Sequence, residues 1–124
     1  MSSKTKAFFA AALLVAPSFV DAETATTRVE YSAVQYLKNF ALSVCISEGY
    51  GAEDVVKDSR AAAGGYLELG RFPIEAYEEA ASLSKTFLAK EYLGKHGEKL
   101  TLMKCIDFFH SKELDQLAKK YDKK

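Results

Sequence analysis

The sequence predicts an all-α fold, a compact bundle of four or five helices with one disulfide. Three observations support this prediction. Apolar residues recur at helical spacing in several segments, and no segment shows the alternating pattern of a β-strand. The 124-residue chain also has a single pair of cysteines, Cys45 and Cys105. Helices with one apolar face become stable by packing those faces together, so a bundle is the expected architecture.

The first residues have the pattern of a secretory signal peptide. Lys4 and Lys6 precede the apolar run AFFAAALLVAPSFV at 7–20, which leads to small residues near Ala22. A membrane-spanning helix needs roughly 20 apolar residues, and this run is shorter and contains a proline. We therefore predict cleavage after Ala22 and export of residues 23–124 as one domain. An uncleaved membrane anchor is the alternative.

The exported part is nearly neutral. Removing residues 1–22 takes away two of the 17 basic and one of the 17 acidic residues, which leaves 15 against 16. Because nucleic-acid binding depends largely on positive charge, we expect no nucleic-acid partner. The sequence KKYDKK at 119–124 is interpreted as a solvated tail. We expect no membrane association after cleavage.

The first helix is predicted from Val29 to Glu48. Its apolar stripe has helical spacing and consists of Ala33, Val34, Leu37, Phe40, Ala41 and Val44. A second, sparser stripe lies opposite and consists of Tyr31, Leu42 and Ile46. A helix that is apolar on two sides is either central in its bundle or partly covered by another subunit. The second stripe is therefore a candidate dimer face.

The second helix is predicted from Glu53 to Leu69. Its inward positions are Val55, Val56, Ala62, Ala63 and Tyr66. Gly64 and Gly65 within it each cost about 1 kcal/mol relative to alanine. We interpret them as a kink or as a close approach of another backbone. A ligand loop is the alternative, which the absence of a preceding strand and a following phosphate-binding lysine disfavours.

Gly70 is expected to end this helix and Pro73 to begin the next. The inward face of the third helix comprises Ala76, Tyr77, Ala80, Leu83, Ser84, Phe87 and Leu88. The last helical segment has an apolar stripe of Leu102, Met103, Ile106, Phe109, His110, Leu114, Leu117 and Tyr121. In a continuous helix Glu113 would fall within this stripe. We therefore predict a break at His110–Ser111, with Ser111 as the cap of the final turns.

The two cysteines could form a disulfide or supply a nucleophile. In an oxidising compartment an even pair indicates a disulfide. Closing the loop between Cys45 and Cys105 should stabilise the fold by roughly 4 kcal/mol. The catalytic alternative needs His110 to reach the thiolate and Asp107 to orient the histidine. On one helix Cys105 and His110 lie about 140° apart, so they cannot face each other. We predict the disulfide and no catalytic residue.

No metal or cofactor is expected. Neither His96 nor His110 is paired with another histidine or cysteine at metal-binding spacing. His110 is interpreted as a core or interface histidine.

Two segments carry a family resemblance. GGYLELGRFPIEAYEEA at 64–80 and MKCIDFFHSKELDQL at 103–117 resemble the periplasmic immunity proteins that bacteria pair with amidase effectors of the type VI secretion system. The order of signal peptide, first cysteine, second cysteine and HSKEL extends the likeness over nearly the whole mature chain. The resemblance implies a small helical homodimer that binds and blocks a peptidoglycan-cleaving cysteine amidase in the periplasm, where it protects against self and sister-cell intoxication.

A protein that blocks a narrow cleft needs a projecting element on a rigid base. The candidate is GKHGEK at 94–99, a connection between two helices that ends six residues before Cys105. Its glycines Gly94 and Gly97 permit tight turns. Its polar contacts would come from Lys95, His96, Glu98 and Lys99. An ordinary solvated connection is the alternative.

A different function class fits some of the same features. Acid-stress chaperones of the periplasm are also short, helical and stapled by one disulfide, and would open at low pH to bind clients. An enzyme is the weakest interpretation, because the cysteine geometry does not support nucleophilic catalysis.

Overall fold

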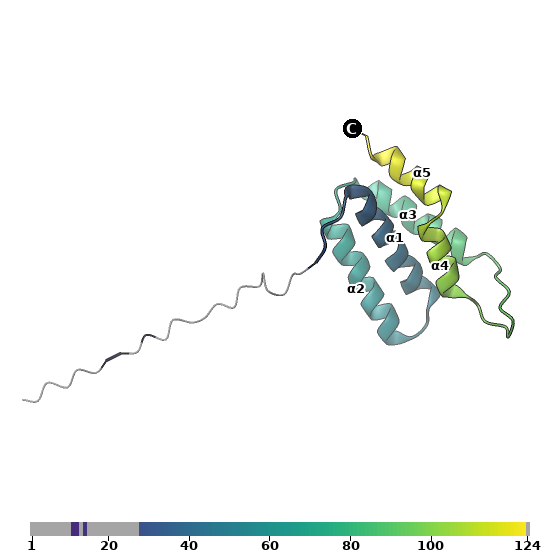
Figure 1. Ribbon diagram of the computed structural model, residues 1–124, viewed down its shortest axis with the longest axis horizontal. Coiled ribbons are helices and arrows are strands. Elements are labelled where there is room, and N and C mark those ends of the chain that lie inside the picture. The colour runs from purple at the N-terminus through teal and green to yellow at the C-terminus, as the bar shows by residue number, and fades with distance from the viewer. Residues whose placement is uncertain (1–10, 13, 15–27, 124) are drawn as a thin grey trace, which may run out of the picture.

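Five helices make up the fold of the computed structural model, which describes residues 11–12, 14 and 28–123. In order along the chain they are α1 (Ala33–Gly49), α2 (Glu53–Leu69), α3 (Ile74–Leu88), α4 (Thr101–Phe109) and α5 (Lys112–Tyr121) (Figure 1). The described residues contain no strand, so the predicted all-α fold is confirmed. Within them no helix has the length and apolar character to cross a membrane. The predicted cleavage site after Ala22 lies outside the described residues.

Helix α1 is the centre of the bundle and contacts each of the other four helices (Figure 1). Its predicted main stripe faces the core, where Leu37, Phe40 and Ala41 are buried. The helix begins at Ala33, four residues after the predicted start at Val29.

A capping box sets the start of α1. The Ser32 hydroxyl accepts a hydrogen bond from the Gln35 backbone N–H at 3.2 Å, and the Gln35 side chain accepts one from the Ser32 N–H at 2.9 Å. These bonds satisfy two donors that would otherwise lack partners at a helix start. Ser32 and Gln35 have the spacing of this motif, so the boundary was readable from the sequence.

The disulfide joins Cys45 of α1 to Cys105 of α4. Their Cα atoms are 5.6 Å apart, within the usual span of a disulfide. Both side chains are fully buried. The predicted disulfide is therefore confirmed, and it attaches the short helix α4 to the central helix.

The predicted break between the last two helices is also confirmed. Helix α4 ends at Phe109, and α5 begins at Lys112. Ser111 is the cap of α5, since its hydroxyl accepts a hydrogen bond from the Leu114 N–H at 3.1 Å. Pro73, predicted as the first residue of α3, instead occupies its cap position.

The outward face of α4 differs from the prediction. Leu102, Met103 and Ile106 were expected to point into the core, but they are 51%, 53% and 44% exposed. The buried residues of this helix are Cys105 and Phe108. The disulfide explains the difference, because it holds Cys105 against α1 and turns the neighbouring apolar stripe outward.

His110, at the end of α4, is exposed. Of its two interpretations, a core or an interface histidine, the first is therefore wrong, and the second stays a prediction. Its ring packs edge-on against the Phe109 ring, with centroids 5.1 Å apart.

Helix α2 runs without a break through Gly64 and Gly65. A Cβ atom built on either glycine would meet no heavy atom within 4 Å, apart from the local backbone of the helix itself. The close backbone approach predicted at this pair is therefore wrong within this chain.

Replacing Gly64 with alanine should stabilise the protein. The residue is exposed in a helix interior, and alanine there is favoured over glycine by about 1 kcal/mol with no steric cost. Urea unfolding should show this gain. Gly70→Ala is the contrasting control, because a Cβ there would overlap the Tyr77 hydroxyl. A Gly64→Ala variant less stable than the parent would contradict the prediction.

Candidate binding loop

The segment between α3 and α4 projects from one end of the bundle (Figure 1). It contains no helix or strand from residue 90 to residue 100. The sequence-predicted binding residues lie here together. Gly94 is partly buried, and the other five are exposed: Lys95, His96, Gly97, Glu98 and Lys99. Their side chains are thus available to a partner without any rearrangement of the core.

The tip of the loop is a tight turn. The Gly97 N–H donates to the Gly94 carbonyl at 3.3 Å, and Gly97 has a φ of 81°, a conformation that favours glycine. The Glu98 carboxylate accepts a hydrogen bond from the His96 N–H at 2.9 Å. A Cβ on Gly94 would overlap that carboxylate. Both glycines therefore serve the turn, as the sequence predicted.

Three side chains support the base of the loop. The Tyr92 hydroxyl donates a 2.6 Å hydrogen bond to the Asp107 carboxylate on α4. The Lys104 ammonium donates to the Leu88 carbonyl at 3.2 Å and lies 5.8 Å from the centre of the Tyr92 ring. The Asp107 carboxylate raises the pKa of Tyr92, because its hydrogen bond favours the protonated phenol. These contacts tie the loop to the helix that carries the disulfide.

One exposed residue beside the loop was missed by sequence reasoning. Leu93 is 94% exposed. A leucine so fully in water contributes nothing to the core, and burial of its side chain by a partner would be favourable by about 2 kcal/mol. Its sequence neighbours gave no periodic signal, since it lies outside any helix.

The catalytic alternative is excluded for Cys105, whose sulfur is bonded to Cys45 and forms no thiolate. Asp107, which the catalytic alternative needs to orient His110, accepts a hydrogen bond from the Tyr92 hydroxyl. Among the described residues there is no cluster of three histidine, cysteine or acidic side chains that could hold a metal ion.

The three residues of the candidate dimer face do not share one helix. Tyr31 precedes α1, and its ring packs edge-on against Tyr36 and Tyr66 with centroid distances of 5.6 and 6.3 Å. Leu42 and Ile46 lie one turn apart on α1, partly buried and packed against the core. Tyr31 is separated from the other two residues because α1 begins at Ala33.

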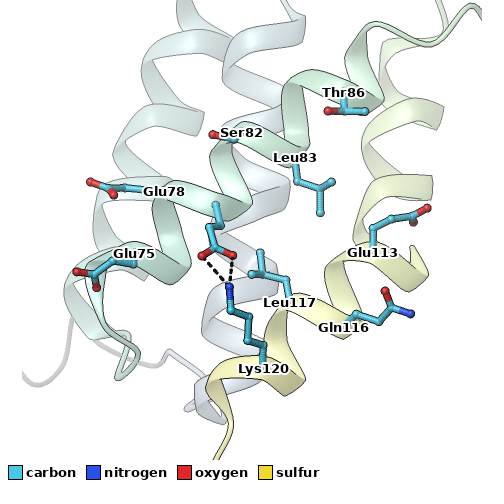
Figure 2. A pocket seen from close by; sticks show the side chains of 10 residues that line it. Glu75, Glu78, Ser82, Leu83, Thr86, Glu113, Gln116, Leu117 and Lys120 are labelled. Carbon is cyan, nitrogen blue, oxygen red and sulfur yellow. Dashed lines mark hydrogen bonds and ion pairs between the residues drawn. The ribbon is translucent and has the colours of Figure 1, made fainter.

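A groove of about 750 Å³ lies between α3 and α5 (Figure 2). Glutamates at 75, 78, 79 and 113 line it, and Leu83 and Leu117 add apolar surface. Glu79 accepts hydrogen bonds from Lys120 at 3.0 and 3.1 Å and from the Tyr121 hydroxyl at 2.6 Å.

These bonds lower the pKa of Glu79, with the Tyr121 hydroxyl as the larger cause and Lys120 as the next. The three residues connect α5 to α3, so their evident role is to hold the last helix. The groove includes no residue of the candidate binding loop, Gly94 to Lys99.

Comparison with known proteins identifies the family. Residues 35–118, from α1 to α5, match the family Tai4, described as the amidase immunity protein of the type VI secretion system (T6SS). This match covers both cysteines and the whole candidate binding loop. The chain belongs to this family. It is thus an immunity protein against a type VI amidase effector, which confirms the resemblance seen in the sequence and sets aside the chaperone alternative.

Solved structures support the assignment of this immunity protein. A chain from the Tae4/Tai4 effector–immunity system of Salmonella typhimurium matches with 39% identity and a TM-score of 0.71, over 76% of this chain and 93% of that one. A Tae4–Tai4 complex from Enterobacter cloacae matches with 23% identity and a TM-score of 0.65, over 71% and 90%.

A third structure pairs Tae4 of Salmonella typhimurium with Tai4 of Enterobacter cloacae, at 23% identity and a TM-score of 0.64 over 71% and 91%. The two matches at 23% support the fold alone. A search of curated proteins finds no match.

Proposed function

We propose that this immunity protein inhibits its cognate amidase by placing the binding loop, Gly94 to Lys99, in the active-site cleft. The proposal includes export to the periplasm with cleavage after Ala22, and no catalytic activity of the immunity protein itself. The observation that carries it is a preformed, exposed turn on a base tied to the disulfide-bonded helix α4. Such a loop has little ordering entropy left to lose on binding.

The chemistry of the loop suits a cleft that contains a catalytic cysteine and histidine. Lys95 and Lys99 carry positive charge, Glu98 carries negative charge, and His96 offers ring nitrogens for hydrogen bonds. All four side chains are solvated in the free protein, so no buried charge must be exposed before binding. Leu93 adds apolar area at the edge of the contact. The loop therefore combines polar specificity with a hydrophobic contact, as binding interfaces commonly do.

Replacing Lys95 to Glu98 with a Gly-Ser linker of equal length should weaken inhibition at least about tenfold, a loss of about 1.4 kcal/mol. The change removes the loop's side chains while leaving the core and disulfide intact. Inhibition constants for the purified amidase measure the effect, and circular dichroism with a thiol assay confirms the fold. A folded variant that inhibits as well as the parent would place the binding site on the helical faces.

The gene next to that of the immunity protein should identify the cognate amidase. Because an effector and its immunity protein must be made together, the neighbouring reading frame should encode a small amidase with a cysteine and a histidine. Its absence would contradict the proposed pairing.

Mass spectrometry of the exported protein tests the processing step, where an N-terminus other than Glu23 would correct the cleavage site.

We also propose that the immunity protein forms a homodimer through the α1 surface that contains Leu42 and Ile46. Both are large apolar residues on one side of the helix and are incompletely buried within the chain. Leu42→Asp together with Ile46→Asp should give a monomer in sedimentation at micromolar concentration, because each charge would be desolvated at the interface.

The matched control places aspartate at Met103 and Ile106, on the exposed apolar face of α4. This variant should remain a dimer. If it is monomeric while the α1 variant remains dimeric, the interface lies on α4. If the parent sediments only as a monomer, the dimer proposal is wrong.

A further inference from the structure

The loop between α3 and α4 needs a connection to the helices if its tip is to hold a fixed position. The turn bonds at Gly94, Gly97 and Glu98 shape the tip but stay within it. Within the described part of the chain, residues 91–99 make one hydrogen bond to a helix, from the Tyr92 hydroxyl to Asp107. The shape of the tip is therefore set locally, whereas its placement depends on Tyr92.

The Tyr92 bond has the geometry of a strong contact. Its 2.6 Å length falls in the range of hydrogen bonds from a hydroxyl to a charged oxygen, which are about twice as strong as neutral ones. The phenol also lies beside the Lys104 ammonium, which donates a hydrogen bond to the carbonyl of Leu88, the last residue of α3. Tyr92 is thus held at the meeting point of the two helices that flank the loop.

The acceptor of this bond is itself fixed. Asp107 is two residues after Cys105 on α4, and Cys105 is bonded to Cys45 on the central helix. A covalent and hydrogen-bonded path therefore runs from α1 through α4 to the base of the loop. Neither Tyr92 nor Asp107 is part of the buried core, so the hydroxyl bond contributes to loop position without being needed for folding.

We propose that Tyr92 is a positioning residue whose hydrogen bond to Asp107 holds the binding loop in its inhibitory conformation before the amidase arrives. This inference rests on the proposed function of the loop. A protein that spends only a fraction of its time in the competent conformation binds more weakly by that same fraction. Loss of the bond should therefore weaken inhibition by lowering the fraction of the free protein that is in the competent conformation. No contact with the amidase is removed.

Tyr92→Phe is the test, since it removes only the hydroxyl and keeps the ring beside Lys104. We expect the inhibition constant for the cognate amidase to rise about fivefold, mainly through slower association, as the competent fraction falls to about one fifth. Amide hydrogen exchange at residues 94–99 should become faster. The midpoint of urea unfolding should fall only slightly, as expected for the loss of one hydrogen bond outside the core.

Tyr121→Phe is the matched control. It removes a tyrosine–carboxylate bond of the same 2.6 Å length, to Glu79, on the side of α3 that faces α5. Inhibition by this variant should be unchanged. Equal weakening by both variants would overturn the inference, because the effect would then be general to such bonds.

Two combined variants separate the ways in which the inference can fail. Tyr92→Phe with Asp107→Ala should weaken inhibition no more than either change alone, because both remove the same bond. Added to the Gly-Ser loop, Tyr92→Phe should have no further effect. If the Gly-Ser loop weakens inhibition but Tyr92→Phe changes neither inhibition nor exchange, the positioning role is wrong and the proposed function stands. If the Gly-Ser loop inhibits normally, the proposed function itself fails.

Discussion

Phe108→Ala should lower the free energy of unfolding by about 3 to 5 kcal/mol, the usual cost of removing a buried phenylalanine. The side chain is fully buried, and its ring packs against Phe87 with centroids 5.1 Å apart. Its loss leaves a cavity where α4 meets α3, which the disulfide prevents from closing completely. Urea denaturation followed by circular dichroism measures the change.

The matched control is Ile106→Ala, two residues away on the same helix. Ile106 is 44% exposed, so we expect a loss below about 1 kcal/mol. The apolar stripe read from the sequence places Ile106 inside and gives no such role to Phe108. Equal losses in the two variants, or a larger loss at Ile106, would show that α4 is oriented as the sequence suggested.

Removing the disulfide should cost about 4 kcal/mol, as the chain-entropy relation gives for a bridge between residues 60 apart. Alanine suits both positions, since a serine hydroxyl would be buried there. Cys45→Ala, Cys105→Ala and the double variant should lose similar amounts, because either change breaks the same bond. Urea unfolding of all three measures this, and reduction of the parent should give a comparable loss.

Losses that add in the double variant would contradict this account, since they would assign the effect to packing of each sulfur separately. A loss of less than about 1 kcal/mol in the free energy of unfolding would show that the disulfide restricts the unfolded chain only slightly. In either case α4 would be held mainly by side chains such as Phe108.

Local features of the sequence were sufficient for much of the fold. Local signals placed α2 at its observed bounds and the start of α3 to within one residue, and Glu113 in an apolar stripe predicted the break that Ser111 caps. The capping box at Ser32 was also present as a local motif, although the predicted helix began earlier. Such signals are readable because each depends on residues three or four positions apart in one helix.

The candidate binding loop was predictable only in part. Gly94 and Gly97 indicated a turn, and the turn is there. The bond between Tyr92 and Asp107 was not predictable, because it joins residues 15 positions apart across a segment with no regular structure. The exposure of Leu93 was missed for a similar reason, since outside a helix no repeating pattern tells which way a side chain points.

The sequence by itself determined the helices, the pairing of Cys45 with Cys105 and the family of the protein. Only the tertiary structure decided which way α4 faces and what the glycine pair in α2 meets. Periodicity shows which apolar residues lie on the same side of a helix. What that side packs against depends on contacts between segments that are distant in the sequence. In this chain the disulfide and Phe108 occupy the core, so Leu102, Met103 and Ile106 remain exposed to water.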